Sequence, residues 1–277
     1  MKITSKIFAA LAVVGFITAP ASGDTVTWQS GVQMYPGSTT QTFVDNSTGT
    51  FVLGFNGTGE GSTPNDDPGV DGSTATTVNG VDFQNVNGFN LNAGVVTDGT
   101  VTVTTSTTMS NDSNAFGDGT FSSDGDIFAL IAGGLWGETT VNLSGLTAGN
   151  QYMVQIFSND SRSGRNSDWQ TGFSDGVNDF ATSMANGTWG TAGLSNRDPV
   201  SGLGEPSGDY IIGTFVAGAS GIQSFDVRGT SNNWSTLNGG RSQLNAFQLR
   251  DLGAVVPEPS SFLVLSLASL MLCKRRR

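Results

Sequence analysis

Short β-prone segments separated by turn residues make up most of this chain, and that spacing limits its folds more than any other feature. Gly, Ser, Thr, Asn and Asp dominate, with 39 glycines among 277 residues. No stretch carries the 3.6-residue apolar periodicity of an amphipathic helix. Short strands at turn-separated intervals are typical of a β-sandwich or barrel. The sequence therefore predicts an all-β fold.

The predicted strands are residues 25–29, 51–55, 81–86, 101–107, 127–131, 140–143, 152–157, 179–182, 210–216, 222–227 and 243–249. The last of these is apolar on both faces, which is typical of a central strand between two layers. One face carries Leu244, Ala246 and Gln248, and the other carries Asn245, Phe247 and Leu249. Residues 57–80 contain few apolar side chains and are predicted to form a long loop within one domain.

Residues 1–21 have the pattern of a secretory signal peptide. Lys2 and Lys6 supply a cationic start, and residues 7–18 form an apolar stretch. The small residues Ala19 and Ala21 then stand where a signal peptidase cuts. We expect cleavage after Ala21 and export of the chain.

The C-terminal residues have the pattern of a short membrane anchor. Pro257-Glu258-Pro259 precedes an apolar run, residues 262–273, which four basic residues follow. A helix over that run is about 18 Å long at ~1.5 Å per residue, whereas a bilayer core is about 30 Å thick. The basic residues are expected to stay in the cytoplasm, which leaves the body of the chain outside.

This tail resembles the PEP-CTERM sorting signal of Gram-negative bacteria that make exopolysaccharide, a segment also known as an ice-binding-protein C-terminal domain. The resemblance implies that an exosortase-type membrane protease acts near Pro257-Glu258-Pro259. An uncut single-pass anchor is the alternative. We divide the chain into a signal peptide (1–21), a β-sandwich domain (22–253) and a sorting segment (254–277). The protein is then expected to be held transiently at the inner membrane before it reaches the cell surface or the extracellular space.

Three segments of the body carry a second resemblance. They are Leu143-Ser-Gly-Leu-Thr-Ala-Gly-Asn-Gln-Tyr152, Val154-Gln-Ile-Phe-Ser-Asn-Asp-Ser-Arg162 and Asn245-Ala-Phe-Gln-Leu249. They resemble segments of exported planctomycete and verrucomicrobial proteins that have the same tail. The resemblance implies a single jelly-roll-like β-sandwich, similar to galactose-binding-like and carbohydrate-binding modules. It supports a fold more than an activity, because a fold hosts many functions.

Charge and residue usage exclude several classes of protein. Six of the 12 Lys and Arg residues lie in the two ends, but only Glu258 of the 23 acidic residues does, so residues 22–256 carry a net charge of about −16. Such a surface repels nucleic acid and attracts divalent cations. The chain has no histidine, and its single cysteine, Cys273, lies in the tail. Ser-His-Asp triads and disulfides within the body are therefore excluded.

The polar segment after the predicted strand 152–157 is the first candidate for a binding site. It contains Asp160, Arg162, Arg165, Asp168 and Trp169. Guanidinium and carboxylate groups hydrogen-bond to sugar hydroxyls, and an indole stacks on the apolar face of a sugar ring. The alternative is an Arg–Asp latch that ties a loop to the sandwich, with Trp169 in the core.

An acidic turn supplies a candidate calcium site. Asp118, Asp124 and Asp126 lie among glycines and serines, and hard oxygen ligands on such loops suit Ca²⁺. The pattern lacks the terminal Glu of the helix-flanked calcium loop. Because Asp-Gly pairs are also ordinary turn residues, either a structural Ca²⁺ or a plain turn accounts for them.

These observations favour a non-catalytic, exported protein of the cell surface or exopolysaccharide matrix. If it binds a ligand, a polysaccharide is favoured. A purely structural matrix protein is the alternative. A glycan hydrolase with two carboxylates is less favoured, because Glu60, Glu138 and Glu205 lie in no catalytic motif. Ice binding is less favoured as well, because the threonine run 100–108 occupies one strand, whereas ice-binding surfaces repeat across many strands.

Overall fold

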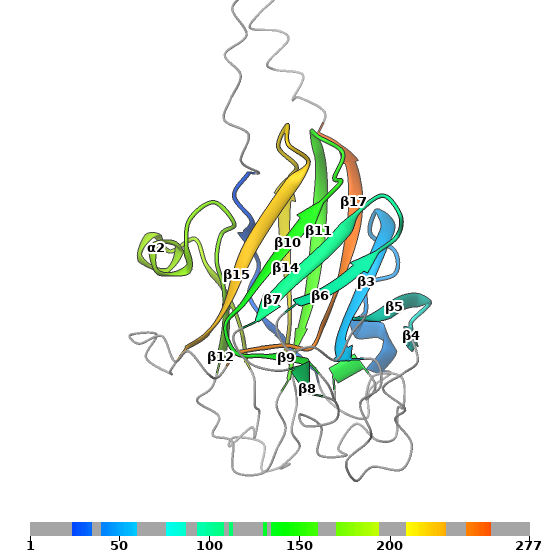
Figure 1. The fold of residues 1–277 in the computed structure, drawn as a ribbon, viewed down its shortest axis with the longest axis horizontal. Coiled ribbons are helices and arrows are strands. Elements are labelled where there is room, and N and C mark those ends of the chain that lie inside the picture. The colour runs from blue at the N-terminus through cyan, green and yellow to red at the C-terminus, as the bar shows by residue number, and fades with distance from the viewer. Residues whose placement is uncertain are drawn as a thin grey trace, which may run out of the picture.

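The computed structural model describes residues 24–34, 40–59, 76–86, 93–107, 111–112, 130–131, 134–159, 170–193, 209–230 and 242–255. Strands in three sheets make up most of these residues. The predicted all-β fold class is confirmed. Figure 1 shows the two larger sheets as layers that face each other.

The largest sheet has eight strands in the described part of the chain. They are β1 (Thr27–Trp28), β2 (Val32–Gln33), β3 (Thr50–Gly59), β4 (Thr76–Val78), β5 (Val81–Val86), β11 (Asn150–Ser158), β14 (Asp209–Val216) and β17 (Ala246–Ala254). The order is β1-β14-β11-β17-β3-β5-β4, with β2 also paired to β14. Only β3 and β5 pair in parallel, and the other neighbours are antiparallel.

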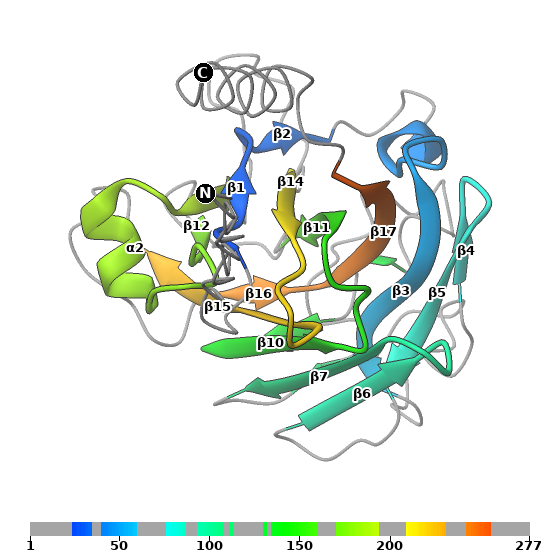
Figure 2. The ribbon, with the colours of Figure 1, turned by 90° about the horizontal axis from the view of Figure 1, so that it is seen from above.

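The second sheet lies across the opening of the first, which curves as an arc when seen from above (Figure 2). Its strands are β6 (Ala93–Thr97), β7 (Thr102–Thr107), β10 (Thr139–Ser144), β12 (Gln170–Phe173), β13 (Gly190–Gly193) and β15 (Ile222–Thr230). They follow the order β13-β12-β15-β10-β7-β6. A small third sheet joins β8 (Asn111–Asp112), β9 (Gly134–Trp136) and β16 (Gln243–Leu244).

The main core fills the space between the two larger sheets. Alternate side chains of β11, namely Tyr152, Val154 and Ile156, enter the same buried cluster as Val141 and Leu143 of β10. This alternation is what the period of two in a β-strand requires. Burial of this apolar surface, at about 25 cal/mol per Å², is the main stabilising contribution to the sandwich.

Strand β17 is central, as its two apolar faces predicted. It pairs with β11 on one side and β3 on the other, and its first five residues are all buried. The Phe247 ring stacks on Phe55 of β3, with ring centroids 4.9 Å apart. The other face of β17, which carries Ala246, packs in a second apolar cluster with Val44, Phe83 and Phe157.

The indole of Trp28 ties the first strand to the core. Its Nε1 donates to the Ser174 carbonyl at 3.0 Å, and its ring lies 5.2 Å from Phe173. A Cβ atom at Gly213 of β14 would lie only 2.6 Å from Trp28 Cζ3. The indole can therefore lie over β14 only because residue 213 has no side chain.

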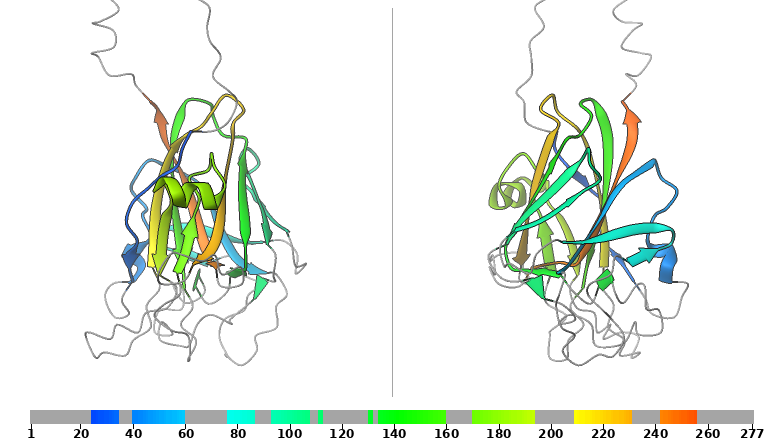
Figure 3. Two further views of the ribbon diagram at one scale, coloured as in Figure 1. Left: turned by 90° about the vertical axis from the view of Figure 1, so that its left-hand side faces the viewer. Right: turned by 45° about the vertical axis from the view of Figure 1, so that its right-hand side comes forward.

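Two of the predicted strands are wrong. Residues 179–182 begin helix α2 (Phe180–Asn186), in which the Asp179 carboxylate accepts the Thr182 N–H and Gly187 ends the helix at φ 71°. Capping at both ends outweighs the weak β-propensity of this short segment. Figure 3 shows α2 beside the sandwich. Of the predicted strand 127–131, only Leu130 and Ile131 lie within the described residues, and both are helical and buried. A short apolar run fits a buried helix as well as a strand.

The prediction of a loop over residues 57–80 is also wrong in part. Strand β3 continues to Gly59, and β4 begins at Thr76. The side chains of Thr76 and Val78 are buried although the segment is polar overall. A turn at Asn79 and Gly80 then connects β4 to β5, whose bounds match the predicted strand 81–86.

Both ends of the described chain lie at one end of the sandwich, the upper end in Figure 1. The N–H of Asp24 donates to the Val216 carbonyl at 3.2 Å, and the N–H of Val255 donates to the Gly149 carbonyl at 3.3 Å. Gly149 N–H in turn donates to Ala217, next to Val216, at 2.8 Å. Residues 24 and 255 are therefore separated only by the ends of neighbouring strands.

Candidate functional site

The site residues predicted from the sequence lie outside the described residues. This holds for the binding segment (Asp160, Arg162, Arg165, Asp168 and Trp169), the acidic turn (Asp118, Asp124 and Asp126) and the processing positions (Ala19, Ala21, Pro257, Glu258 and Pro259). Within the described ranges, no three His, Cys, Asp or Glu residues gather as a metal site. The helices described there include none that is long and apolar enough to cross a bilayer.

The strands that flank the predicted binding segment are fixed to each other. Strand β11 ends at Ser158, β12 begins at Gln170, and the Ser158 hydroxyl donates to Thr171 Oγ1 at 3.1 Å. The N–H of Asn159 donates to Asn245 Oδ1 at 2.7 Å. The two larger sheets are thus joined where this segment leaves and re-enters the described part of the chain.

A polar hollow lies on the outer face of the largest sheet, on the side away from the main core. Its volume is about 510 Å³. The 3-10 helix η1 (Thr40–Phe43) and residues 44–47 form one wall, and β11, β14 and the β4–β5 turn supply the rest. The lining residues are Thr42, Phe43, Val44, Asp45, Asn46, Ser47, Asn79, Gln155, Tyr210 and Ile212. The volume lies within the usual range for small-molecule sites.

Two buried glutamines hold the wall of the hollow against the sheet. Gln155 Nε2 donates to the Phe43 carbonyl at 2.6 Å, and Gln155 Oε1 accepts the Asp45 N–H at 3.0 Å. Gln248 Nε2 donates both to Gln155 Oε1 at 2.6 Å and to the Asp45 carbonyl at 2.8 Å. Because both amides are almost fully buried, each of these hydrogen bonds would leave an unsatisfied polar group if it broke.

Arg250 fixes the next part of the same loop. Its side chain is buried, with 4% of the residue surface exposed, and its hydrogen-bond partners are all uncharged oxygens. The guanidinium donates to the carbonyls of Asp45, Asn46, Thr48 and Gly49 and to Gln248 Oε1. These five acceptors match the five N–H donors of a guanidinium. The loop 45–49 is therefore wrapped around one buried cation.

The carboxylate of Asp45 lines the hollow. Its Oδ1 accepts the Ser47 N–H at 2.8 Å, the Ser47 hydroxyl at 3.3 Å and the Thr48 N–H at 3.0 Å. Burial alone would raise the pKa of the Asp45 carboxyl, but the hydrogen bonds from Thr48 and Ser47 outweigh it and lower the pKa. Asp45 is therefore ionised at neutral pH, and it is the only charged group among the lining residues.

Tyr210 supplies an aromatic wall of the same hollow. Its ring lies 6.3 Å from Phe43 and 6.2 Å from Phe157, so it is packed on two sides. Burial and the charge of Asp45 raise the pKa of the Tyr210 hydroxyl, which keeps it protonated. An apolar ring next to hydrogen-bonding groups is the combination that recognises a sugar.

The β4–β5 turn closes the rim. Asn79 adopts φ 51°, a left-handed conformation that asparagine tolerates better than most residues. Its Nδ2 donates to the Val44 carbonyl at 2.7 Å, and its own carbonyl accepts from Asn46 Nδ2 at 3.1 Å. The rim and the wall of the hollow are therefore cross-linked by side-chain amides.

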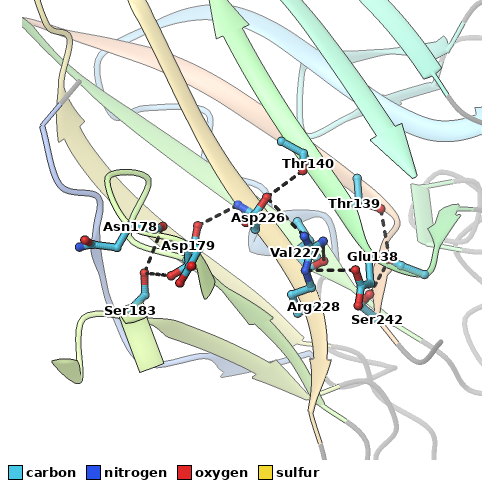
Figure 4. A network of polar contacts seen from close by, with 12 residues as sticks. Glu138, Thr139, Thr140, Asn178, Asp179, Ser183, Asp226, Val227, Arg228 and Ser242 are labelled. Carbon is cyan, nitrogen blue, oxygen red and sulfur yellow. Dashed lines mark hydrogen bonds and ion pairs between the residues drawn. The ribbon is translucent and has the colours of Figure 1, made fainter. Parts of the chain in front are cut away.

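A second polar cluster lies on the outer face of the six-stranded sheet, on β10 and β15 (Figure 4). Arg228 lies between two carboxylates, with Nε 3.5 Å from Glu138 Oε2 and NH2 3.7 Å from Asp226 Oδ1. Thr140 donates to Asp226 Oδ1 at 2.7 Å. Each carboxylate contacts the arginine, so this cluster resembles a partly exposed ion-pair network more than a ligand site.

The comparisons with known proteins add no identity to this geometry. No protein-family model, curated protein or solved structure matches the chain. The hollow is therefore interpreted from its own residues alone.

Sequence reasoning missed the hollow because its residues are far apart in the chain. Gln155, Gln248 and Arg250 carried one usable signal, since all three are long polar side chains on or next to strands predicted to be buried. Buried polar side chains need partners, and here they mark the place where a loop is held against the sheet. The partner loop, residues 43–49, had no signal beyond its turn-forming composition.

Proposed function

We propose that this chain is an exported, non-catalytic jelly-roll module of the cell surface or exopolysaccharide matrix that binds a saccharide in the hollow between Asp45 and Tyr210. The observation that carries the proposal is the combination of a packed phenol ring with a carboxylate and amides on a fixed frame. The signal-peptide pattern at residues 1–21 and the PEP-CTERM-like tail support export and sorting. The ionised Asp45 and the acidic body support a polysaccharide partner over a nucleic acid.

Binding is favoured over hydrolysis for a chemical reason. Glycosidases use two carboxyl groups that flank the scissile bond. The described lining of the hollow supplies one, and that one is held ionised by its hydrogen bonds. A second carboxyl that stays protonated, the general acid of such a reaction, is not among these lining residues.

The test is binding of the full-length chain, purified in detergent, to polysaccharide from its own source, measured by isothermal titration calorimetry. Loss of the Tyr210 ring in Tyr210→Ala should weaken the affinity by about two- to tenfold, because stacking on an aromatic ring contributes about 0.5–1.5 kcal/mol. Tyr210→Phe keeps the ring and should retain most of the affinity.

The result separates the proposal from the structural alternative. If the native chain binds no polysaccharide, or if Tyr210→Ala binds as tightly as the native chain, the protein is better described as a structural component of the matrix. Thermal melts of both variants by circular dichroism show whether a loss of binding reflects a loss of fold.

A further inference from the structure

The charge in the lining of the hollow is negative only. Asp45 is the only charged lining residue, and the body of the chain contains no lysine. The nearest cation in the frame is Arg250, whose donors all point to oxygens of residues 45–49 and of Gln248. A ligand in the hollow therefore meets a negative charge with no accessible arginine among the lining residues to offset it.

The hydrogen-bonding groups left over in the hollow favour a donor-rich ligand. The hydrogen bonds from Ser47 and from the Thr48 N–H converge on Oδ1 of Asp45, so the carboxylate keeps further acceptor capacity. Asn46 donates through Nδ2 to Asn79, so its Oδ1 remains as an acceptor. Two acceptors, one of them charged, thus border the same space as the Tyr210 ring.

We propose that the hollow selects a saccharide unit that carries a protonated amine, namely a hexosamine without an N-acetyl group. This rests on the proposed function, in that it assumes the hollow is a saccharide site. The ammonium group would donate to the Asp45 carboxylate, and the apolar face of the ring would lie on Tyr210. An ammonium–carboxylate hydrogen bond is about twice as strong as a neutral one.

The same arrangement disfavours acidic sugars. A uronate or sulfated unit would place a second negative charge beside Asp45 in a body whose net charge is already negative. Partial burial strengthens this repulsion, because the charges are less screened than in bulk water. A neutral sugar is accepted through hydroxyl hydrogen bonds to Asp45, but it lacks the ion pair that an ammonium group adds.

The experiment compares three probes of equal length on the full-length chain in detergent: glucosamine, N-acetylglucosamine and glucose oligomers. The glucosamine oligomer should bind at least about tenfold more tightly than the other two. Asp45→Asn should remove that preference and leave weak binding of all three. An asparagine Oδ1 still accepts the N–H groups of Ser47 and Thr48, so the loop is expected to keep its conformation.

Asp24→Asn is the matched control. It removes the same charge from an exposed position where β14 ends at Val216, away from the hollow, and should leave the preference intact. An equal loss in both variants would mean that the amine responds only to the net charge of the chain, which overturns the inference. Equal affinity of the native chain for all three oligomers overturns it as well, while the saccharide site stands. If no oligomer or source polysaccharide binds at all, the proposed function fails too.

Discussion

Among single residues, Arg250 is the one on which the shape of the hollow depends most. Its guanidinium is buried against four backbone carbonyls and one side-chain amide. Truncation in Arg250→Met leaves these acceptors without donors, so we expect the free energy of unfolding to fall by about 2–4 kcal/mol. Urea denaturation of the full-length chain, followed by far-UV circular dichroism, measures this loss.

Arg228 is the matched control for Arg250. It is also an arginine on a strand of the sandwich, but it is partly exposed and bound to the carboxylates of Glu138 and Asp226. Arg228→Met should cost less than about 1 kcal/mol, because exposed ion pairs contribute little. Equal losses in the two variants would show that the buried position of Arg250 is not what makes it important.

At the scale of elements, the segment from Asp175 to Thr188 is held by one carboxylate. Asp175 accepts the N–H groups of Val177 and Asn178, the Asn178 side-chain amide and the Thr188 hydroxyl, the last at 2.6 Å. Burial opposes ionisation of Asp175, but these hydrogen bonds outweigh it and lower the pKa from 3.8 to about 2. Because the pKa is lower in the folded state, this stabilisation is present above about pH 4 and is lost as the pH falls towards 2.

The acid sensitivity of Asp175 can be tested by substitution. In Asp175→Asn, the free energy of unfolding at neutral pH should fall by about 1–2 kcal/mol, and the part of its pH dependence between about pH 4 and pH 2 should disappear. Thr188→Val removes one donor and should give an intermediate slope. Urea unfolding at several pH values gives the result, and an unchanged acid slope in Asp175→Asn would contradict the assignment.

Strands with clear alternation could be predicted from the sequence alone, whereas the short helix α2 and the hollow could not. The strand 81–86 and the central place of β17 followed from alternation and from apolar residues on both faces. Helix α2 carried a capping aspartate and a terminal glycine, but its seven residues are too few for a helical periodicity to emerge. The hollow was beyond sequence reasoning, because Asp45, Gln155 and Tyr210 meet only after β11 and β14 have paired.

At the scale of the whole molecule, the hollow and the chain ends occupy different places. Asp24 and Val255 hydrogen-bond to Val216 and Gly149, at one end of β14 and β11. Tyr210 lies near the other end of β14, where it pairs with Phe157. A chain held through its C-terminal segment, as the sequence of the tail predicts, would therefore keep the hollow away from the point of attachment.

This separation predicts how the chain tolerates an inserted domain. A small folded domain inserted after Val255 should leave both the melting temperature and saccharide affinity close to those of the native chain. The same domain between Asn79 and Gly80 should abolish binding, because Asn79 lines the hollow and holds Val44. The Gly80 turn is open, with no atom within 4 Å of a Cβ built there, so the chain should still fold. Calorimetry of both insertions against the native chain decides the matter, and loss of binding in the Val255 insertion would place the saccharide site near the chain ends instead.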